Sequence, residues 1–161
     1  MDGVICDFNT KFSEIRQDYP NLEDSKFFEL AILKHNIFST LKPLPDALEL
    51  LEYVACLKHV YVEMLTSVGT FDEKLGYAVK IQKSGWLERN NIPHKPNFSR
   101  SMQEKAEYAN AYSILVDDSI GCIEPFQEAG GHGVLHVNAK QTIKEIDDTF
   151  KKMKEIEAYR S

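Results

Sequence analysis

Short apolar runs that stop at polar residues alternate with amphipathic segments along this chain, and this alternation limits the folds open to it. Residues 112 to 116 form an apolar run that stops at Asp117 and Asp118. Residues 59 to 67 carry the β-branched and aromatic side chains typical of a strand, and residues 133 to 137 are apolar enough for another. Strands that alternate with helices build a mostly parallel sheet with helices on both faces. We therefore expect an α/β fold.

The segments between these strands are predicted to be helical. Their apolar residues recur at three- and four-residue spacing over residues 47 to 57, 72 to 90, 119 to 129 and 142 to 159. Asp46 is expected to cap the first of them. Residues 4 to 8 can form a strand or lie in a buried loop. Residues 9 to 40 are polar and rich in aromatic side chains, and we expect a small helical insertion there. With 161 residues the chain is long enough for one core, so residues 1 to 161 are taken as a single domain.

The composition excludes several classes of partner. A net charge of -6 argues against binding a nucleic acid polymer or an anionic membrane surface. No stretch approaches the ~18 apolar residues of a membrane span. The three cysteines, Cys6, Cys56 and Cys122, have wide spacings without a CxxC pair, which indicates free thiols. The first residues do not resemble a secretory signal, so a cytoplasmic location is expected.

Polar side chains flank the expected strands. Asp2 precedes the run at residues 4 to 8, Thr66 and Ser67 close another strand, and Asp117 and Asp118 follow a third. The carboxyl ends of parallel strands share one edge of a sheet, where ligands commonly bind. Adjacent carboxylates repel each other unless a cation lies between them, and Mg²⁺ prefers such oxygen ligands. Taken singly, a hydroxyl pair after a strand is more often a helix cap.

Lys105 precedes the acidic pair, at the start of a segment expected to be helical. On its own it is most simply a solvated lysine. In this position it could also neutralise a phosphate. A phosphate-receiver domain combines similar groups, but its acidic pair comes near the start of the chain and its lysine comes last. The order found here favours a different family.

Read in order, the segments MDGVICDF, LKPLPDALELLEYV and VEMLTS, then a lysine ahead of ILVDDS, and finally EAGGHGVLH resemble the haloacid-dehalogenase superfamily of phosphohydrolases. The chain is most similar to small phage and bacterial members that are like 5'(3')-deoxyribonucleotidases, and the likeness spans nearly its whole length. It implies a Rossmann-like three-layer core with a cap at residues 9 to 40. It also implies Mg²⁺-dependent hydrolysis of a small phosphorylated substrate, a nucleotide.

The resemblance assigns roles to these residues. Thr66 would donate a hydrogen bond to the phosphoryl oxygens with help from Ser67, and Lys105 would neutralise the charge of the phosphate. Asp117 and Asp118 would hold Mg²⁺ together with Asp2, which would also act as general acid and base.

In the family the first strand ends in Asp-x-Asp-Gly-Val, and the first Asp is the nucleophile. Here Met1 occupies the x position and Asp2 the second acid, so the nucleophile and its strand would precede this sequence. One explanation is a start at an internal methionine of a longer reading frame, which the retention of Asp2, Thr66 and Lys105 favours. The alternative is a catalytically inactive pseudo-phosphatase that serves as a ligand-binding or protein-interaction module.

Overall fold

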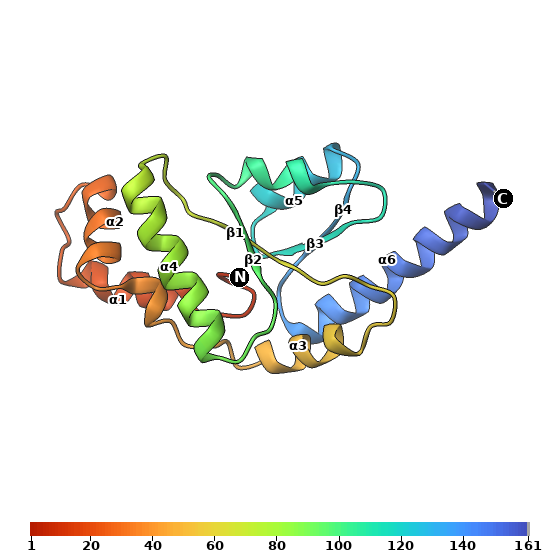
Figure 1. The fold of residues 1–161 in the computed structure, drawn as a ribbon, viewed down its shortest axis with the longest axis horizontal. Coiled ribbons are helices and arrows are strands. Elements are labelled where there is room, and N and C mark those ends of the chain that lie inside the picture. Colours follow the sequence, from red (N-terminus) through yellow and green to blue (C-terminus); the bar gives the residue numbers. More distant parts are fainter. Residues whose placement is uncertain (161) are drawn as a thin grey trace.

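The chain adopts a mixed α/β fold with short parallel strands (Figure 1). This computed structural model describes the backbone of residues 1–160 and the side chains of residues 1–155. Its strands are β1 (Met64–Ser67), β2 (Pro96–Ser99), β3 (Ile114–Asp117) and β4 (His132–Leu135). They form two parallel pairs, β1 with β2 and β3 with β4. The expected alternation of strands and helices is confirmed, but the strands form two separate sheets instead of one.

The helices follow the expected order. They are α1 (Phe8–Gln17), α2 (Asp24–Leu33), α3 (Ala47–Cys56), α4 (Glu73–Arg89), α5 (Ile120–Glu128), α6 (Ala139–Arg160) and the short 3-10 helices η1 (Ile37–Ser39) and η2 (Gln103–Tyr108). The Asp72 carboxylate caps α4 by accepting a hydrogen bond from Leu75 N. Asp46 occupies the N-cap position of α3 as predicted, but its side chain makes no capping hydrogen bond: its Oδ2 accepts from Ala139 N, 2.6 Å away, at the start of α6. Asp46 therefore joins two helices that are distant in sequence.

The helices surround the strand pairs on different sides. Figure 1 shows α5 above the β3–β4 pair and α3 and α6 below it, while α1, α2 and α4 gather at the other end of the molecule. Helices α1, α2 and η1 fall almost entirely within residues 9 to 40, the range expected to form a helical insertion, and both α2 and η1 pack against α4. Within the described residues, no helix is both long and apolar enough to cross a membrane.

Two apolar segments do not pair as strands along their whole length. Residues 4 to 8 take the buried-loop alternative: Val4, Ile5 and Cys6 are buried, and the turn is closed by a hydrogen bond from Ile5 N to Met1 O of 2.9 Å. Gly3 makes this turn at φ +69°, a conformation that favours glycine. Residues 59 to 63 have the composition of a strand but no ladder partner, so β1 begins only at residue 64.

The largest buried side chains lie where the N-terminal helices meet α4. Phe27, Ile32, Ile37, Val79 and Trp86 are almost completely buried there. The indole Nε1 of Trp86 donates to Leu41 O at 2.8 Å, so its polar atom is satisfied within the core. This packing fixes α4 against the segment from residues 9 to 40.

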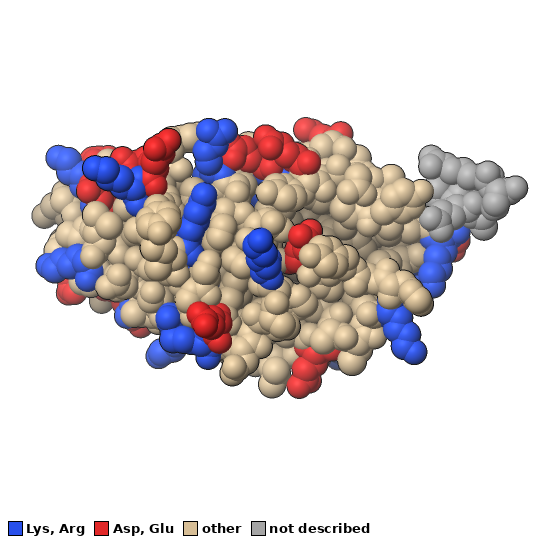
Figure 2. Space-filling view, viewed as in Figure 1, with Lys and Arg blue, Asp and Glu red and all other residues tan. Residues whose placement is uncertain are grey.

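The charged side chains on one face of the molecule are mixed in sign. Figure 2 shows Lys and Arg standing among Asp and Glu, with wide uncharged areas between them. Among the described residues, the Lys and Arg side chains on this face do not form a continuous basic patch. This distribution agrees with the net charge of -6.

Candidate functional site

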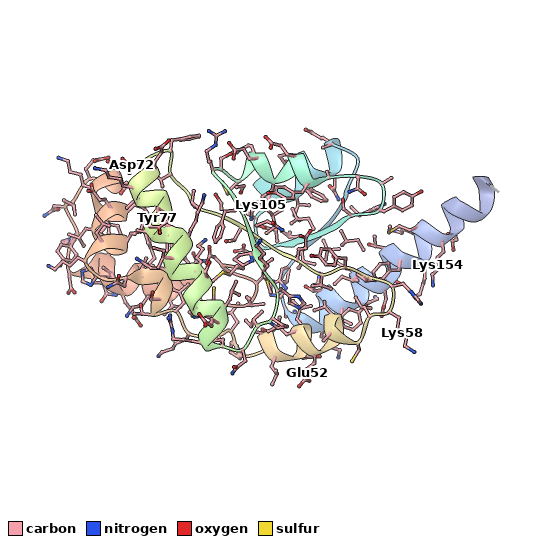
Figure 3. All side chains as sticks on the ribbon, viewed as in Figure 1. Glu52, Lys58, Asp72, Tyr77, Lys105 and Lys154 are labelled. Atoms are coloured by element: carbon pink, nitrogen blue, oxygen red, sulfur yellow. The ribbon has the colours of Figure 1, made fainter. Side chains whose placement is uncertain are left out.

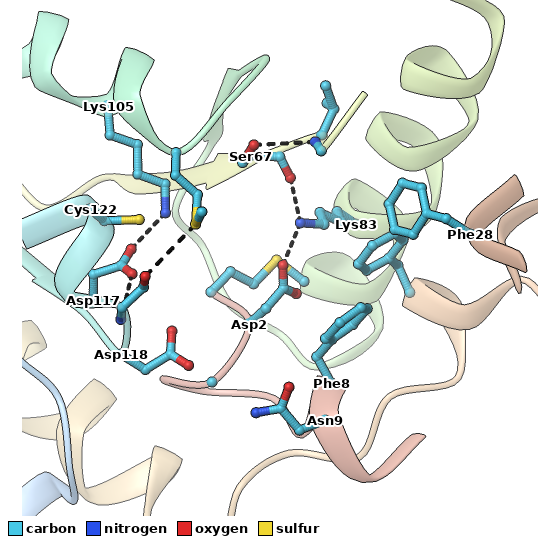
Figure 4. A pocket seen from close by; sticks show the side chains of 17 residues that line it. Asp2, Phe8, Asn9, Phe28, Ser67, Lys83, Lys105, Asp117, Asp118 and Cys122 are labelled. Carbon is cyan, nitrogen blue, oxygen red and sulfur yellow. Dashed lines mark hydrogen bonds and ion pairs between the residues drawn. The ribbon is translucent and has the colours of Figure 1, made fainter. Parts of the chain in front are cut away.

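A cavity of about 400 Å³ opens where the ends of β1 and β3 approach the N-terminal turn (Figure 4). The predicted site residues that line it are Asp2, Ser67, Lys105, Asp117 and Asp118. Thr66 does not line it, because its side chain is 1% exposed and lies behind Lys83. The structure thus brings side chains that are far apart in the sequence to one pocket, with Thr66 in the layer beneath.

One wall of the pocket holds a buried ion pair between η2 and β3. Lys105 Nζ donates to Asp117 Oδ2 at 2.6 Å, and the two side chains are 7% and 5% exposed. Asp117 Oδ1 also accepts from Ser119 N at 3.1 Å, at the start of α5. Figure 3 shows Lys105 in the interior of the view, in contrast to Lys58 and Lys154 at its margin. Burial lowers the pKa of Lys105, but the Asp117 carboxylate outweighs it and the pKa is raised.

Asp118 differs from its neighbour because no hydrogen bond or ion pair engages its carboxylate within the described part of the chain. Asp118 is exposed, but desolvation of its carboxylate at the pocket wall and the adjacent Asp117 raise its pKa. The carboxylate lies against Gly3, where an added Cβ would be 1.9 Å from Asp118 Oδ2. A glycine at this position therefore makes room for an unpaired carboxylate.

The opposite wall contains Lys83, which the sequence analysis did not select. Its Nζ donates to Asp2 Oδ2 at 2.5 Å, to Thr66 Oγ1 at 2.8 Å and to Ser67 O at 2.7 Å. Burial raises the pKa of Asp2, but Lys83 and the other neighbouring groups outweigh it, so the pKa is lowered. A signal for Lys83 existed, because it follows Val79 by four residues and so falls on the buried side of α4.

The Ser67 hydroxyl is used within the protein. It donates to Arg100 O at 3.2 Å and accepts from Gly69 N at 3.2 Å. A hydroxyl has one hydrogen to donate, so in this arrangement Ser67 has none left for a ligand. Ser67 therefore stabilises the loop after β1. Lys105 has N–H donors that remain available for a ligand.

Aromatic rings from the segment at residues 8 to 38 form the third side of the pocket. Phe8, Phe28 and the amide of Asn9 line it (Figure 4). Phe38 also belongs to the lining. The rings of Phe8 and Phe38 stack with centroids 5.5 Å apart and planes at 12°. Phe28 meets Phe38 edge-on, with centroids 6.5 Å apart and planes at 79°. The pocket thus has a charged end and an apolar, aromatic end.

The acidic side chains of the pocket do not form a closed metal centre. Among the described residues, no three His, Cys, Asp or Glu side chains are arranged to hold a metal ion. Asp2 and Asp117 are each paired with a lysine, whereas Asp118 is not. Mg²⁺ keeps several of its waters and needs only one or two carboxylates. Of the three carboxylates, Asp118 is the one that no described residue engages, whereas both oxygens of Asp117 accept hydrogen bonds, from Lys105 and from Ser119 N.

Comparison with protein-family models gives no match for this chain, and no curated protein matches its sequence.

Proposed function

We propose that this pocket binds a phosphate monoester together with Mg²⁺, as in the phosphohydrolases of the haloacid-dehalogenase superfamily. The observation that carries the proposal is the convergence of Lys105, Asp117 and Asp118 on one cavity of about 400 Å³. A buried lysine with free N–H donors suits a phosphate dianion, and an unpaired carboxylate beside another suits a divalent cation. Part of the same proposal is that the two parallel pairs and their helices belong to a Rossmann-like three-layer core.

Asp117 and Asp118 are the residues that would hold Mg²⁺. The ion would supply positive charge next to the phosphate and relieve the repulsion between the two carboxylates. Lys105 would donate to the phosphate from the other side, while Asp117 keeps its Nζ in place.

The aromatic end of the pocket supports a nucleotide as the phosphate ester. Planar bases stack on aromatic rings, and such stacking stabilises binding by about 1–3 kcal/mol per base. The half-buried Phe8 and Phe28 supply such rings, backed by the buried Phe38, and the amide of Asn9 offers both a donor and an acceptor. The distribution of charged and aromatic residues along the pocket matches the two parts of a nucleotide.

Turnover needs a nucleophile in addition to this binding site. By the resemblance described above, the attacking carboxylate would stand one residue before Met1. We therefore expect the chain of residues 1 to 161 to bind nucleotide without hydrolysing it. A chain extended before Met1 by a strand that ends in Asp is expected to hydrolyse nucleotides with Mg²⁺.

A second candidate is a binding module without chemistry, and the state of Asp2 favours it. Its Oδ2 accepts from Lys83 and its Oδ1 from the Cys6 thiol, so both oxygens are engaged by the protein. A general acid has to transfer its proton to the leaving group of the substrate, and a carboxylate engaged at both oxygens is poorly placed to do so. In this role the chain would hold a nucleotide or display it to a partner protein.

The test is calorimetry of nucleoside monophosphates with Mg²⁺, followed by a phosphate-release assay on the extended chain. Binding that is lost in Asp118→Asn and kept in the exposed control Asp18→Asn supports the proposed site. Phosphate release by the extended chain favours the phosphohydrolase, and tight binding without release favours the module. If the folded wild-type chain binds neither phosphate nor nucleotide, the proposal fails.

A further inference from the structure

Lys83 is a lysine buried at the pocket, and its surroundings differ from those of Lys105. Its side chain is 1% exposed, and its α4 neighbours Val79 and Trp86 belong to the core. A buried ammonium is costly unless its N–H groups are paired. The contacts of Lys83 therefore show what it can do for the site.

All the N–H donors of Lys83 have acceptors inside the protein. An ammonium has three N–H groups, and here they face a carboxylate oxygen of Asp2, the hydroxyl of Thr66 and the carbonyl of Ser67. Lys105, in contrast, has Asp117 Oδ2 as its one acceptor among the described residues. Lys105 can thus donate to a ligand without breaking a protein contact, and Lys83 cannot.

The contacts of Lys83 come from separate parts of the chain. Asp2 lies in the N-terminal turn, Thr66 and Ser67 end β1, and the ring of Phe38 in η1 lies 4.4 Å from Nζ in a cation–π contact. Figure 4 shows Lys83 between Ser67 and Asp2, across the pocket from the Lys105–Asp117 pair. One ammonium joins the N-terminal turn, the end of β1 and the aromatic wall.

We infer that Lys83 is a positioning residue: it fixes Asp2 and the end of β1 so that the phosphate site keeps its shape, and it leaves ligand binding to Lys105. This inference rests on the proposed phosphate site only for the role of Lys105. The role of Lys83 follows from its protein contacts. Thr66 contributes to the same positioning role, because its hydroxyl lies behind the pocket and accepts a hydrogen bond from Lys83.

The test is NMR of the full chain with isotope-labelled lysine, titrated with inorganic phosphate and Mg²⁺. The ammonium protons of Lys83 are expected to exchange with water slowly, whereas those of the exposed Lys74 exchange fast. On addition of phosphate the Nζ signal of Lys105 should shift while that of Lys83 stays in place. Fast exchange at Lys83, or a larger shift at Lys83 than at Lys105, overturns the inference.

A variant provides a second readout. In Lys83→Met, amide hydrogen exchange of Gly3, which donates to Cys6 O at 2.9 Å, should become faster by about tenfold or more. The matched control Lys74→Met on the same helix should leave this rate unchanged. Lys83→Arg keeps the charge, but its planar fork does not suit three acceptors around one nitrogen, so it should not restore slow exchange. Full restoration by Arg, or unchanged exchange in Lys83→Met, contradicts the inference.

The experiments distinguish a failure of the proposed phosphate site from a failure of the inference about Lys83. If no lysine signal responds to phosphate, the proposed phosphate site is refuted, and slow exchange at Lys83 still decides whether it holds the N-terminal turn. If Lys83→Met does not fold, the exchange and titration of the wild-type chain decide the question.

Discussion

Replacement of Lys105 by Met removes the ammonium that faces Asp117 and keeps most of the length of the side chain. Both partners are nearly buried, with 7% and 5% of their side chains exposed. Breaking such a pair by removing one partner costs about 3–5 kcal/mol, because an unpaired charge stays buried. Asp117 keeps the hydrogen bond from Ser119 N and lies next to a cavity that admits water. We therefore expect the low end, a loss of about 3 kcal/mol in the free energy of unfolding.

Urea denaturation of wild-type, Lys105→Met, Asp117→Asn and the double variant measures this loss. For a chain of this size, about 3 kcal/mol corresponds to a fall in melting temperature of roughly 6–12 °C. The double variant should lose less than Lys105→Met alone, because it leaves no unpaired buried charge. The control Lys74→Met should stay within about 0.5 kcal/mol of wild-type. A loss below about 1 kcal/mol in Lys105→Met, or strictly additive losses in the double variant, would refute this account of the pair.

Other residues of the pocket give further predictions. The folded pKa of Lys105 is raised above 10.5, so the stability that the pair contributes is fully present below that pH and is lost as pH rises through the raised value. The difference in unfolding free energy between wild-type and Lys105→Met should therefore stay constant up to about pH 10 and shrink only above it. Gly3→Ala places a side chain at φ +69° and pushes the Asp118 carboxylate away, so we expect at least about 1 kcal/mol less stability and weaker Mg²⁺ binding by calorimetry; wild-type values for both would contradict this. Phe28→Ala should weaken binding of a nucleoside monophosphate by about tenfold or more and leave inorganic phosphate unaffected, and an equal loss for both ligands would exclude a stacking role for Phe28.

The sequence predicted the helices and the ends of two strands well, because both depend on local patterns. The apolar periodicity of residues 47 to 57 and 72 to 90 gave the positions of α3 and α4 to within about two residues. Strand β2 was missed because Pro96 and Asn97 have low strand propensity, and its register with Met64–Ser67 supplies what the local sequence lacks. Residues 59 to 63 show the reverse case, since strand composition without a pairing partner leaves an irregular segment outside the sheet.

The candidate site was only partly visible in the sequence. Asp117 and Asp118 could be placed because the apolar run before them stops abruptly, and Lys105 because it precedes that run. Lys83 was missed because a lysine on a helix is most often solvated, and its burial depends on acceptors from distant segments. The burial of Thr66 beneath it could not be predicted for the same reason.

The separation of the strands into two pairs affects how the pocket can respond to a ligand. Within the described residues, no ladder hydrogen bonds connect the β1–β2 pair to the β3–β4 pair. Lys105 belongs to one half of the molecule and Lys83 to the other, and the short turn at Gly3 lies between them. The two pairs are therefore joined by side chains, since one buried core contains residues of both halves, such as Val79 in α4 and Val134 in β4. Because such a core is close-packed, a ligand that moved one half against the other would have to disturb this packing.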